Sequence, residues 1–357
     1  MINSDTILPL ANDLIQSDGP KLNDRERTIL RSIIHNYILT ADPVGSRALA
    51  RRYHLTLSPA SIRNTMSDME DLGLLAHPHT SAGRVPTSLG YRCYVNDLMM
   101  VEELSAEERR VIETTLEGTV PEASEMLDQV TSLLAEVSKL IAFILAPDIS
   151  TVTLEKVELV RVAAGRVMVV IIVSGGMVRT IMLEIASPIT DTEIALAAQF
   201  INGRLSGMKL ADIPRQITRR LAGDSRASNA LVRLFLDFPE RIFSTDPKSD
   251  VHFGGTRHVL DQQEFRDPNR VRGIIELIED RDVIVHLMKE RLPGVTVTIG
   301  EENSPEQLKD FSVITSTYRT GEASGTVGII GPTRMNYSKL MALVEYTARL
   351  VGEKAGG

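Results

Sequence analysis

The stretch Ser58-Pro-Ala-Ser-Ile-Arg-Asn-Thr-Met-Ser-Asp-Met-Glu-Asp-Leu-Gly73 decides how the N-terminal part of this 357-residue chain folds. Ser58 is a favourable N-cap, proline suits the first helical position, and glycine suits the end of a helix. Apolar side chains recur at i, i+4 and i+7 and therefore share one face, namely Ile62, Met66 and Met69. The stretch predicts a helix that begins at Pro59, ends at Gly73 and turns this apolar face inward.

The other face of this helix is small, polar and basic. It carries Ser61, Arg63, Asn64, Thr65 and Ser67. Such a face suits the major groove of duplex DNA, because Asn can pair with adenine through two hydrogen bonds and Arg can bond guanine or phosphate. We expect Arg63 and Asn64 to contact bases or phosphates. Ser58, besides capping the helix, and Ser61 are expected near a phosphate at the positive N-terminus of the helix.

Two further helices are expected before this one. Residues 24–40 carry a broad apolar face at helical spacing, Pro43 breaks that helix, and Ser46 can cap a short helix that reaches about residue 53. A helix, a short helix, a turn and a capped helix are typical of helix-turn-helix DNA-binding domains. Arg47, on the short helix, is expected to reach a phosphate.

A small hairpin is expected after the third helix. Residues 74–76 and 84–86 suggest two short strands joined by a polar loop. Such a hairpin is typical of the wing of a winged helix. Arg84 and the loop-tip residues Thr80 and Ser81 are expected to follow the minor groove or the DNA backbone.

These elements predict a winged helix-turn-helix domain over residues 23–100, preceded by a mobile arm over residues 1–22. The distribution of charge agrees with this prediction. The chain has a formal net charge of -8, yet residues 21–100 hold ten Lys and Arg against seven Asp and Glu. Basic charge is thus concentrated in one segment of an otherwise acidic chain, as expected when one domain contacts DNA.

Composition excludes several classes of protein. No apolar run is long enough to span a bilayer and the N-terminus lacks a signal peptide, so we expect a cytoplasmic, nucleoid-associated protein. The single cysteine, Cys93, excludes an intrachain disulfide. Neither His77 and His79 with Cys93, nor His252 with His258, has the spacing of a structural zinc site. We predict no metal, no cofactor and no catalytic residue.

The pattern beyond residue 100 predicts an α/β region interrupted by a helical block. An amphipathic helix is expected over residues 122–143, before an antiparallel meander with strands at 151–162, 166–173 and 177–185. Helical patterns dominate residues 191–241 and resume from 269. Strands return at 295–299, 311–318 and 325–330, followed by a closing helix. A sheet interrupted in this way indicates an inserted domain.

Four motifs near the two ends of the chain carry a family resemblance. They are Asp42-Pro-Val-Gly-Ser-Arg47, Ser61-Ile-Arg-Asn64, Pro78-His-Thr-Ser-Ala-Gly-Arg-Val-Pro-Thr87, and Gly331-Pro-Thr-Arg-Met335 with Tyr337. Together they resemble the bacterial heat-inducible transcription repressor family HrcA. The resemblance implies an α+β multidomain protein with an N-terminal winged helix-turn-helix and a C-terminal GAF-like α/β domain over 101–190 and 267–357. It also implies a mainly helical dimerisation domain inserted at 191–266.

The resemblance implies a function as well. Family members are expected to prevent heat-shock induction by binding, as homodimers, an inverted-repeat operator called CIRCE. The operator lies before the operons of the chaperonin GroEL/GroES and of GrpE-DnaK-DnaJ, and GroEL modulates the repressor. A palindromic operator requires a two-fold protein, which ties dimerisation to DNA binding.

Other functions stay open on the residues alone. The GAF-like domain could be a small-molecule sensor that sets DNA affinity, and winged helices also serve as protein-interaction modules. An enzyme is the weakest class, because the chain has no nucleophile elbow, metalloprotease motif or kinase signature.

Overall fold

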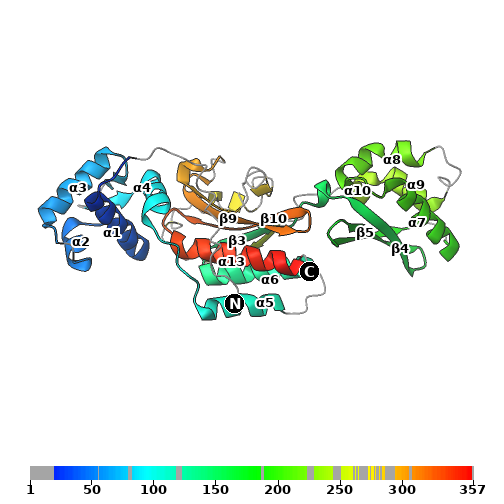
Figure 1. Cartoon of the computed structure of the whole chain (residues 1–357), viewed down its shortest axis with the longest axis horizontal. Coiled ribbons are helices and arrows are strands. Elements are labelled where there is room, and N and C mark those ends of the chain that lie inside the picture. The colour runs from blue at the N-terminus through cyan, green and yellow to red at the C-terminus, as the bar shows by residue number, and fades with distance from the viewer. Residues whose placement is uncertain are drawn as a thin grey trace, which may run out of the picture. The chain divides into compact units, whose positions relative to one another are not determined.

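The structure, a computed structural model, describes residues 20–54, 56–78, 83–117, 123–185, 189–222, 229–243, 251–259, 294–304 and 308–355, with scattered positions between 262 and 285. The chain is an α+β protein with two compact units (Figure 1). The first unit comprises Met1–Leu145, Val251–Thr317 and Thr326–Leu350, and the second comprises Ala146–Asp250, Tyr318–Gly325 and Val351–Gly357. Residues 1–19 of the expected arm, and most of the region expected to be helical from residue 269, lie outside the described residues.

The first unit begins with a group of short helices and a hairpin. The elements are α1 (Asp24–Thr40), α2 (Ser46–Arg52), α3 (Pro59–Asp71), β1 (Leu75–Ala76), β2 (Val85–Pro86), α4 (Ser88–Cys93) and the π-helix η2 (Tyr94–Leu98). We call residues 24–98 the helical module. β1 and β2 pair antiparallel, with Leu75 opposite Pro86. The three helices and the two strands expected from the sequence are therefore confirmed, with ends shifted by one or two residues.

Local signals explain most helix starts in this module. Asn23 and Glu26 form a capping box at α1, and the Thr87 side chain accepts a hydrogen bond from the Gly90 N–H at α4. The expectation that Ser46 caps α2 is wrong. The cap position is Gly45, whose extended backbone makes no side-chain hydrogen bond, and Ser46 is already helical.

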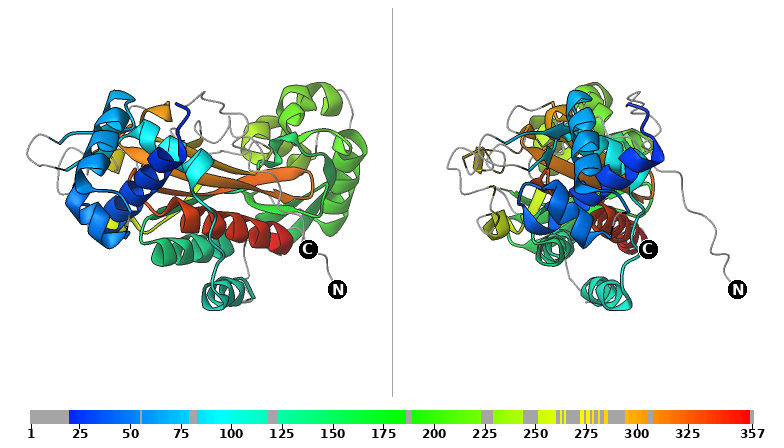
Figure 2. Two further views of the ribbon diagram at one scale, coloured as in Figure 1. Left: turned by 60° about the vertical axis from the view of Figure 1, so that its left-hand side comes forward. Right: turned by 90° about the vertical axis from the view of Figure 1, so that its left-hand side faces the viewer.

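A five-stranded sheet forms the centre of the first unit. Its strand order is β7-β3-β10-β9-β8, from the strands β3 (Ile141–Leu145), β7 (Val251–Gly254), β8 (Val295–Ile299), β9 (Phe311–Thr320) and β10 (Ala323–Pro332). The helices α6 (Ala123–Ser138) and α13 (Tyr337–Ala355) lie side by side along one face, and α5 (Ala106–Glu117) lies outside them (Figures 1 and 2).

The expected helix over residues 122–143 is wrong at its C-terminal end. α6 ends at Ser138, Lys139 adopts a left-handed backbone with φ 58°, and β3 starts two residues later at Ile141. Four of the five β3 residues are buried. A strand buried on both faces is a continuous apolar run, so periodicity alone did not distinguish it from the last turns of a helix.

The second unit contains the expected antiparallel meander and a group of helices. Its strands are β4 (Leu154–Ala163), β5 (Arg166–Val173) and β6 (Val178–Glu184), and its helices are α7 (Asp191–Leu205), α8 (Ile213–Leu221), α9 (Ala230–Asp237) and α10 (Pro239–Phe243). Alternate residues of β5 are buried, and they join Phe200, Ile217 and Phe235 from the helices in one apolar core. The meander therefore belongs with the helices.

This packing moves the boundaries of the interrupting region. The sequence suggested 191–266, whereas the second unit begins at Ala146 and its first long segment ends at Asp250. The meander lies in the second unit because its buried face packs on α7–α10. The strand-like stretch after residue 250 is β7, which pairs with β3 in the first unit.

Candidate nucleic-acid interface

The outer face of α3 carries the polar side chains expected to meet DNA. The Ser58 hydroxyl accepts a hydrogen bond from the Ser61 N–H (3.1 Å), which caps the helix, and it donates to the Ser61 hydroxyl (3.2 Å). Arg63 and Asn64 are exposed on the first turns of α3. The opposite face is buried through Ile62, Met66 and Met69, as expected. α3 thus presents Arg63 and Asn64 to solvent from a helix anchored in the module.

Thr65 does not belong to this outer face. It is buried, and its hydroxyl donates to the Ser61 carbonyl oxygen (3.2 Å). Position 65 lies three residues after Ile62 and four before Met69, so it falls on the buried stripe of the helix. The expectation of an outward Thr65 is therefore wrong.

Three arginines that are far apart in sequence line one pocket beside α3. The pocket has a volume of about 280 Å³ and is lined by Gly45, Ser46, Arg47, Arg63, Met66 and Arg84. Arg47 comes from α2, Arg63 from α3, and Arg84 from the residue before β2. The structure therefore brings together three of the predicted site residues at the junction of α2, α3 and the hairpin.

Arg84 occupies the base of the hairpin. Its backbone N–H and C=O pair with those of Val44 (3.0 and 2.8 Å), which joins the hairpin to the turn before α2. Its guanidinium forms an ion pair with Glu70 of α3 (2.8 Å), and its Nε is buried with no hydrogen-bond partner among the described residues. Arg84 thus links three elements, whereas Thr80 and Ser81 lie outside the described residues.

Gly83 is needed for this close approach. A Cβ atom at Gly83 would lie 2.6 Å from the Pro43 carbonyl carbon, a distance that requires the backbone to shift. The hairpin can therefore lie against the α1–α2 turn only with glycine at this position.

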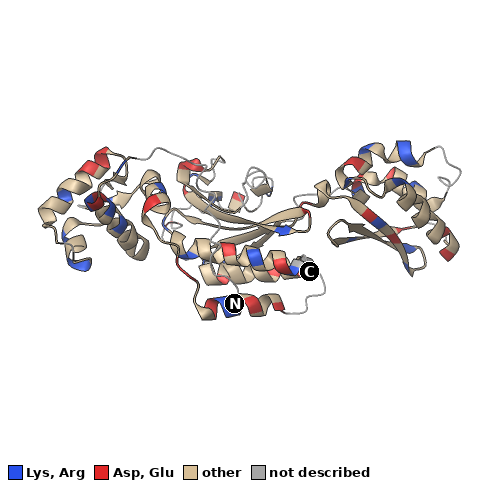
Figure 3. Cartoon of the chain, in the orientation of Figure 1, with Lys and Arg blue, Asp and Glu red and all other residues tan. Residues whose placement is uncertain are grey.

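The charges along α3 are unequal. Figure 3 shows basic residues on both α2 and α3, and the acidic residues of α3 gather at its C-terminal end, namely Asp68, Glu70 and Asp71. The N-terminal end carries the positive partial charge of a helix terminus and the nearby Arg63. An anion is thus favoured at the N-terminal half of α3 and disfavoured at its other end.

Sequence reasoning missed one residue that positions α3. Arg25 of α1 donates from Nη2 to the Ser61 carbonyl oxygen (2.7 Å). This contact joins residues 36 positions apart, so no local pattern indicates it. Arg25 therefore holds the first turn of α3 against α1.

His252 and His258, the second pair weighed above as zinc ligands, lie beside carboxylates, whereas His79 of the first set lies outside the described residues. The His252 ring lies 2.7 Å from an Asp128 carboxylate oxygen, and the His258 ring lies 3.2 Å from Glu136, so both join the 251–259 segment to α6. Within the part of the chain that the structure describes, no three His, Cys, Asp or Glu side chains gather as metal ligands. Cys93 is buried, and this burial raises the pKa of its thiol, opposite to the shift of a reactive cysteine. No helix among these residues has the length and apolarity to cross a membrane.

Comparisons with known proteins agree over most of the chain. Residues 124–341 match the family model described as HrcA protein C terminal domain. A protein of Desulfitobacterium hafniense named heat-inducible transcription repressor HrcA is 35% identical over 336 residues, covering 93% of this chain and 97% of the relative. A protein of the same name from Chlorobium luteolum is 38% identical over 344 residues, with 92% and 96% covered.

A solved structure has a similar fold. The crystal structure of a hypothetical protein at 2.2 Å resolution superimposes with a TM-score of 0.66 and 24% sequence identity, covering 94% of this chain and 99% of that chain. This likeness concerns the fold alone.

Proposed function

The chain belongs to the HrcA family of heat-inducible transcription repressors, and we propose that its helical module is a winged helix-turn-helix that binds operator DNA. Negative regulation of heat-shock genes is the function of this family. In the proposal, α3 lies in the major groove, where Arg63 and Asn64 reach base edges. The hairpin β1–β2 serves as the wing.

The observation that carries the proposal is the convergence of Arg47, Arg63 and Arg84 on one pocket beside α3. Guanidinium groups form paired hydrogen bonds with phosphate, so the pocket favours a phosphate of the DNA backbone, which we assign to Arg47 and Arg84, while Arg63 extends from the edge of the pocket to a base. Glu70 offsets only part of this positive charge. A phosphate held here would fix the register of the neighbouring α3 on the duplex, while Ser58 and Ser61 approach the backbone at its N-terminus.

We further propose that the protein binds as a homodimer through the outer face of the meander. Four large apolar residues are exposed there, namely Val160 (41%), Val162 (53%), Val178 (58%) and Met182 (45%). Val160, Met168 and Met182 lie opposite one another across the three strands. Exposed apolar patches of this kind mark interfaces, and a second copy of the same face gives the two-fold contact that an inverted repeat requires. The proposed interface thereby moves from 191–266 to β4–β6.

The family likeness supports the remaining parts of the proposal. The operator is the inverted repeat CIRCE before chaperone operons, the protein acts at the cytoplasmic nucleoid, and GroEL modulates it. The five-stranded sheet with α6 and α13 corresponds to the GAF-like domain. One measurement distinguishes this proposal from the alternative in which the GAF-like domain is a small-molecule sensor. The affinity for the operator is measured with each metabolite of a panel, and a sensor requires that at least one metabolite changes it.

Fluorescence anisotropy on labelled duplexes tests DNA binding. The full-length protein is titrated onto the CIRCE inverted repeat and onto a scrambled duplex of equal length and composition at several salt concentrations. We expect at least 1,000-fold preference for the operator, on the order of what specific DNA-binding proteins reach. Equal affinity for both duplexes would refute operator recognition.

A further inference from the structure

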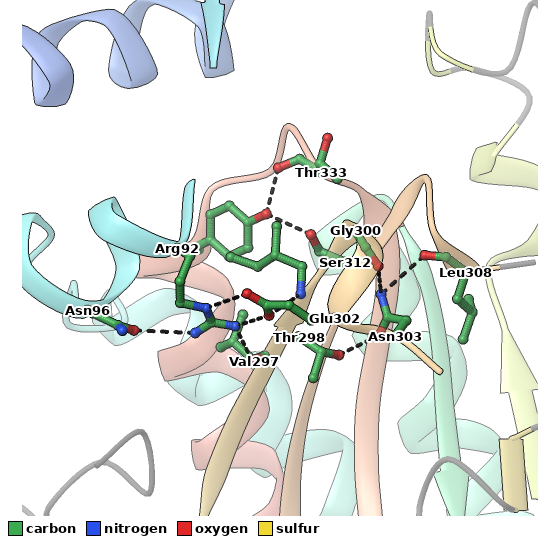
Figure 4. A network of polar contacts seen from close by, with 12 residues as sticks. Arg92, Asn96, Val297, Thr298, Gly300, Glu302, Asn303, Leu308, Ser312 and Thr333 are labelled. Atoms are coloured by element: carbon green, nitrogen blue, oxygen red, sulfur yellow. Dashed lines mark hydrogen bonds and ion pairs between the residues drawn. The ribbon is translucent and has the colours of Figure 1, made fainter. Parts of the chain in front are cut away.

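Arg92 joins the helical module to the five-stranded sheet through a buried guanidinium. Its side chain is only 3% exposed. Nε donates to one carboxylate oxygen of Glu302 (2.8 Å), and Nη2 donates to the other and to the Val297 carbonyl oxygen (2.7 Å). Nη1 donates to Asn96 within the module (3.3 Å). Figure 4 shows this arginine extending from α4 to the end of β8. The paired geometry fixes direction as well as distance.

The acceptor side of this contact is itself held in place. The second oxygen of Glu302 accepts from the Ile299 N–H (2.8 Å), and the Asn303 amide donates to the carbonyl oxygens of Gly300, Leu308 and Phe311. Gly300 has φ 58°, and a Cβ atom there would lie 2.3 Å from the Ser88 hydroxyl oxygen. The turn after β8 is therefore held by its own hydrogen bonds and lies in direct contact with the start of α4.

Arg334 makes a second attachment, at the other end of the module. It lies in the Gly331–Tyr337 motif. None of the contacts with DNA proposed above involves a residue of this motif. Its Nε and Nη2 donate to Glu264 (2.6 and 3.2 Å), and its Nη1 donates to the Ile38 carbonyl oxygen of α1 (2.8 Å). The C-terminal carbonyls of a helix favour a positive charge, and the last turn of α1 has no basic residue of its own. Arg334 supplies that charge from the segment between β10 and α13.

A third set of contacts starts at α13. The Ser338 hydroxyl donates to the Met100 carbonyl oxygen (2.6 Å) and accepts from the Glu102 N–H (2.9 Å), which holds the segment leaving the module. The Tyr337 ring lies 5.7 Å from the Tyr91 ring of α4. Complete burial raises the pKa of the Tyr337 phenol, which stays protonated and donates to the Thr333 carbonyl oxygen (2.6 Å).

Three separate attachments define the orientation of one rigid body on another. Here they start from α4, from the end of α1 and from the segment after η2, and all three end on the same sheet and its helix α13. We propose that Arg92 and Arg334 are positioning residues that hold the helical module at a fixed angle, and that this angle sets the half-site spacing which the dimer accepts. The inference rests on the DNA-binding function proposed above.

A spacing series tests this role. Full-length wild type, Arg334→Met, Arg92→Lys and Ser338→Ala are titrated onto inverted repeats whose central spacer is native or changed by one to three base pairs, and onto a single half-site. Two base pairs rotate one half-site by about 70° relative to the other. Arg257→Met is the matched control, because the ion pair of Arg257 with Glu136 is exposed and involves no residue of the helical module.

We expect wild type and Arg257→Met to lose about 100-fold in affinity when the spacer changes by two base pairs, since only one half-site can then engage. We expect the three variants to lose less than about 10-fold, with half-site affinity within about twofold of wild type. Arg92→Lys keeps the positive charge but loses the paired hydrogen bonds to Glu302. Ser338→Ala leaves no buried charged group without its partner. These two variants therefore test the inference even if Arg334→Met is unstable. Folded, dimeric variants that keep the wild-type spacing preference would overturn the inference. A wild type without operator preference would instead contradict the proposed function.

Discussion

The guanidinium of Arg84 lies 2.8 Å from the carboxylate of Glu70, so the base of the hairpin is tied to the C-terminal part of α3. Arg84 also lines the pocket with Arg47 and Arg63. In the proposed complex a DNA phosphate competes with Glu70 for this guanidinium. Glu70 therefore limits how strongly the pocket attracts phosphate in general.

Glu70→Gln should raise the affinity for scrambled DNA by about threefold to tenfold at low salt, because it removes one negative charge beside the pocket. It should also reduce the free energy of unfolding by about 1 kcal/mol, since the ion pair is partly buried. Anisotropy on scrambled DNA and urea unfolding measure the two effects. Glu103→Gln is the control, because Glu103 is exposed in an ion pair with Arg109. An unchanged affinity would show that Glu70 does not influence the pocket.

Arg63→Ala and Asn64→Ala should each weaken operator binding by about 1 to 3 kcal/mol while changing binding to scrambled DNA much less. Both side chains are exposed on the outer face of α3, where base edges are within reach in the proposed complex. Anisotropy with both duplexes separates the effects. Equal losses on the two duplexes would mean that neither residue reads bases.

Arg47→Ala should weaken binding to operator and scrambled DNA alike and reduce the slope of log affinity against log salt by about 0.9. The physical reason is the loss of one cation from the pocket that we assign to a phosphate. A salt series from low to physiological ionic strength measures the slope. If only operator binding fell, Arg47 would have to contact a base.

Val178→Asp should convert the dimer to a monomer and lower affinity for the inverted repeat by about 100-fold, because a charge would enter the apolar outer face of the meander. Sedimentation velocity at micromolar concentration measures the change. Val111→Asp is the matched control, since Val111 is 42% exposed on α5. A Val178→Asp protein that still sediments as a dimer would place the interface elsewhere.

Glu108 should contribute to stability in a way that is lost in acid. The pKa of Glu108 is lowered from 4.5 to about 2. The largest cause is a hydrogen bond from Lys339, and the next largest causes are hydrogen bonds from Ser105. A carboxylate with a lowered pKa in the folded state stabilises the fold above about pH 4.5 and loses this effect as the pH falls toward 2. Urea midpoints at about pH 7 and pH 3 should differ less in Glu108→Gln than in wild type. Glu117→Gln, on the same helix, should behave like wild type.

Much of the helical module was predictable because its signals are local. The cap at Ser58, the proline after it and the spacing of Ile62, Met66 and Met69 all act within one helix, and the structure confirms each. The same local logic explains one of the two errors there, since Thr65 falls on the buried stripe, and the other is the cap of α2, which is Gly45 and not Ser46. Spacing also identified the meander through the glycines at its turns, Gly165 and Gly175.

The remaining features depend on contacts between distant residues. Arg47, Arg63 and Arg84 were each identified as site residues, but their convergence on one pocket depends on how α2, α3 and the hairpin pack. Arg92 and Glu302 are 210 positions apart, and neither residue stands out in its own segment. The extent of the second unit was missed for a similar reason, because a strand pattern does not indicate which helices cover it.

The order of strands in the central sheet also has a consequence for synthesis. β3 lies between β7 and β10, and its residue Leu145 pairs with Val251 and Thr326. A ribosome that adds 5 to 20 residues per second needs about 10 to 35 s to make the roughly 180 residues between Leu145 and Thr326. Until Thr326 is made, the nascent chain carries an apolar strand with at least one edge unpaired, while the helical module, built from local contacts, can already fold. The repressor is therefore most exposed to aggregation, and most accessible to folding helpers, between the synthesis of β3 and that of β10.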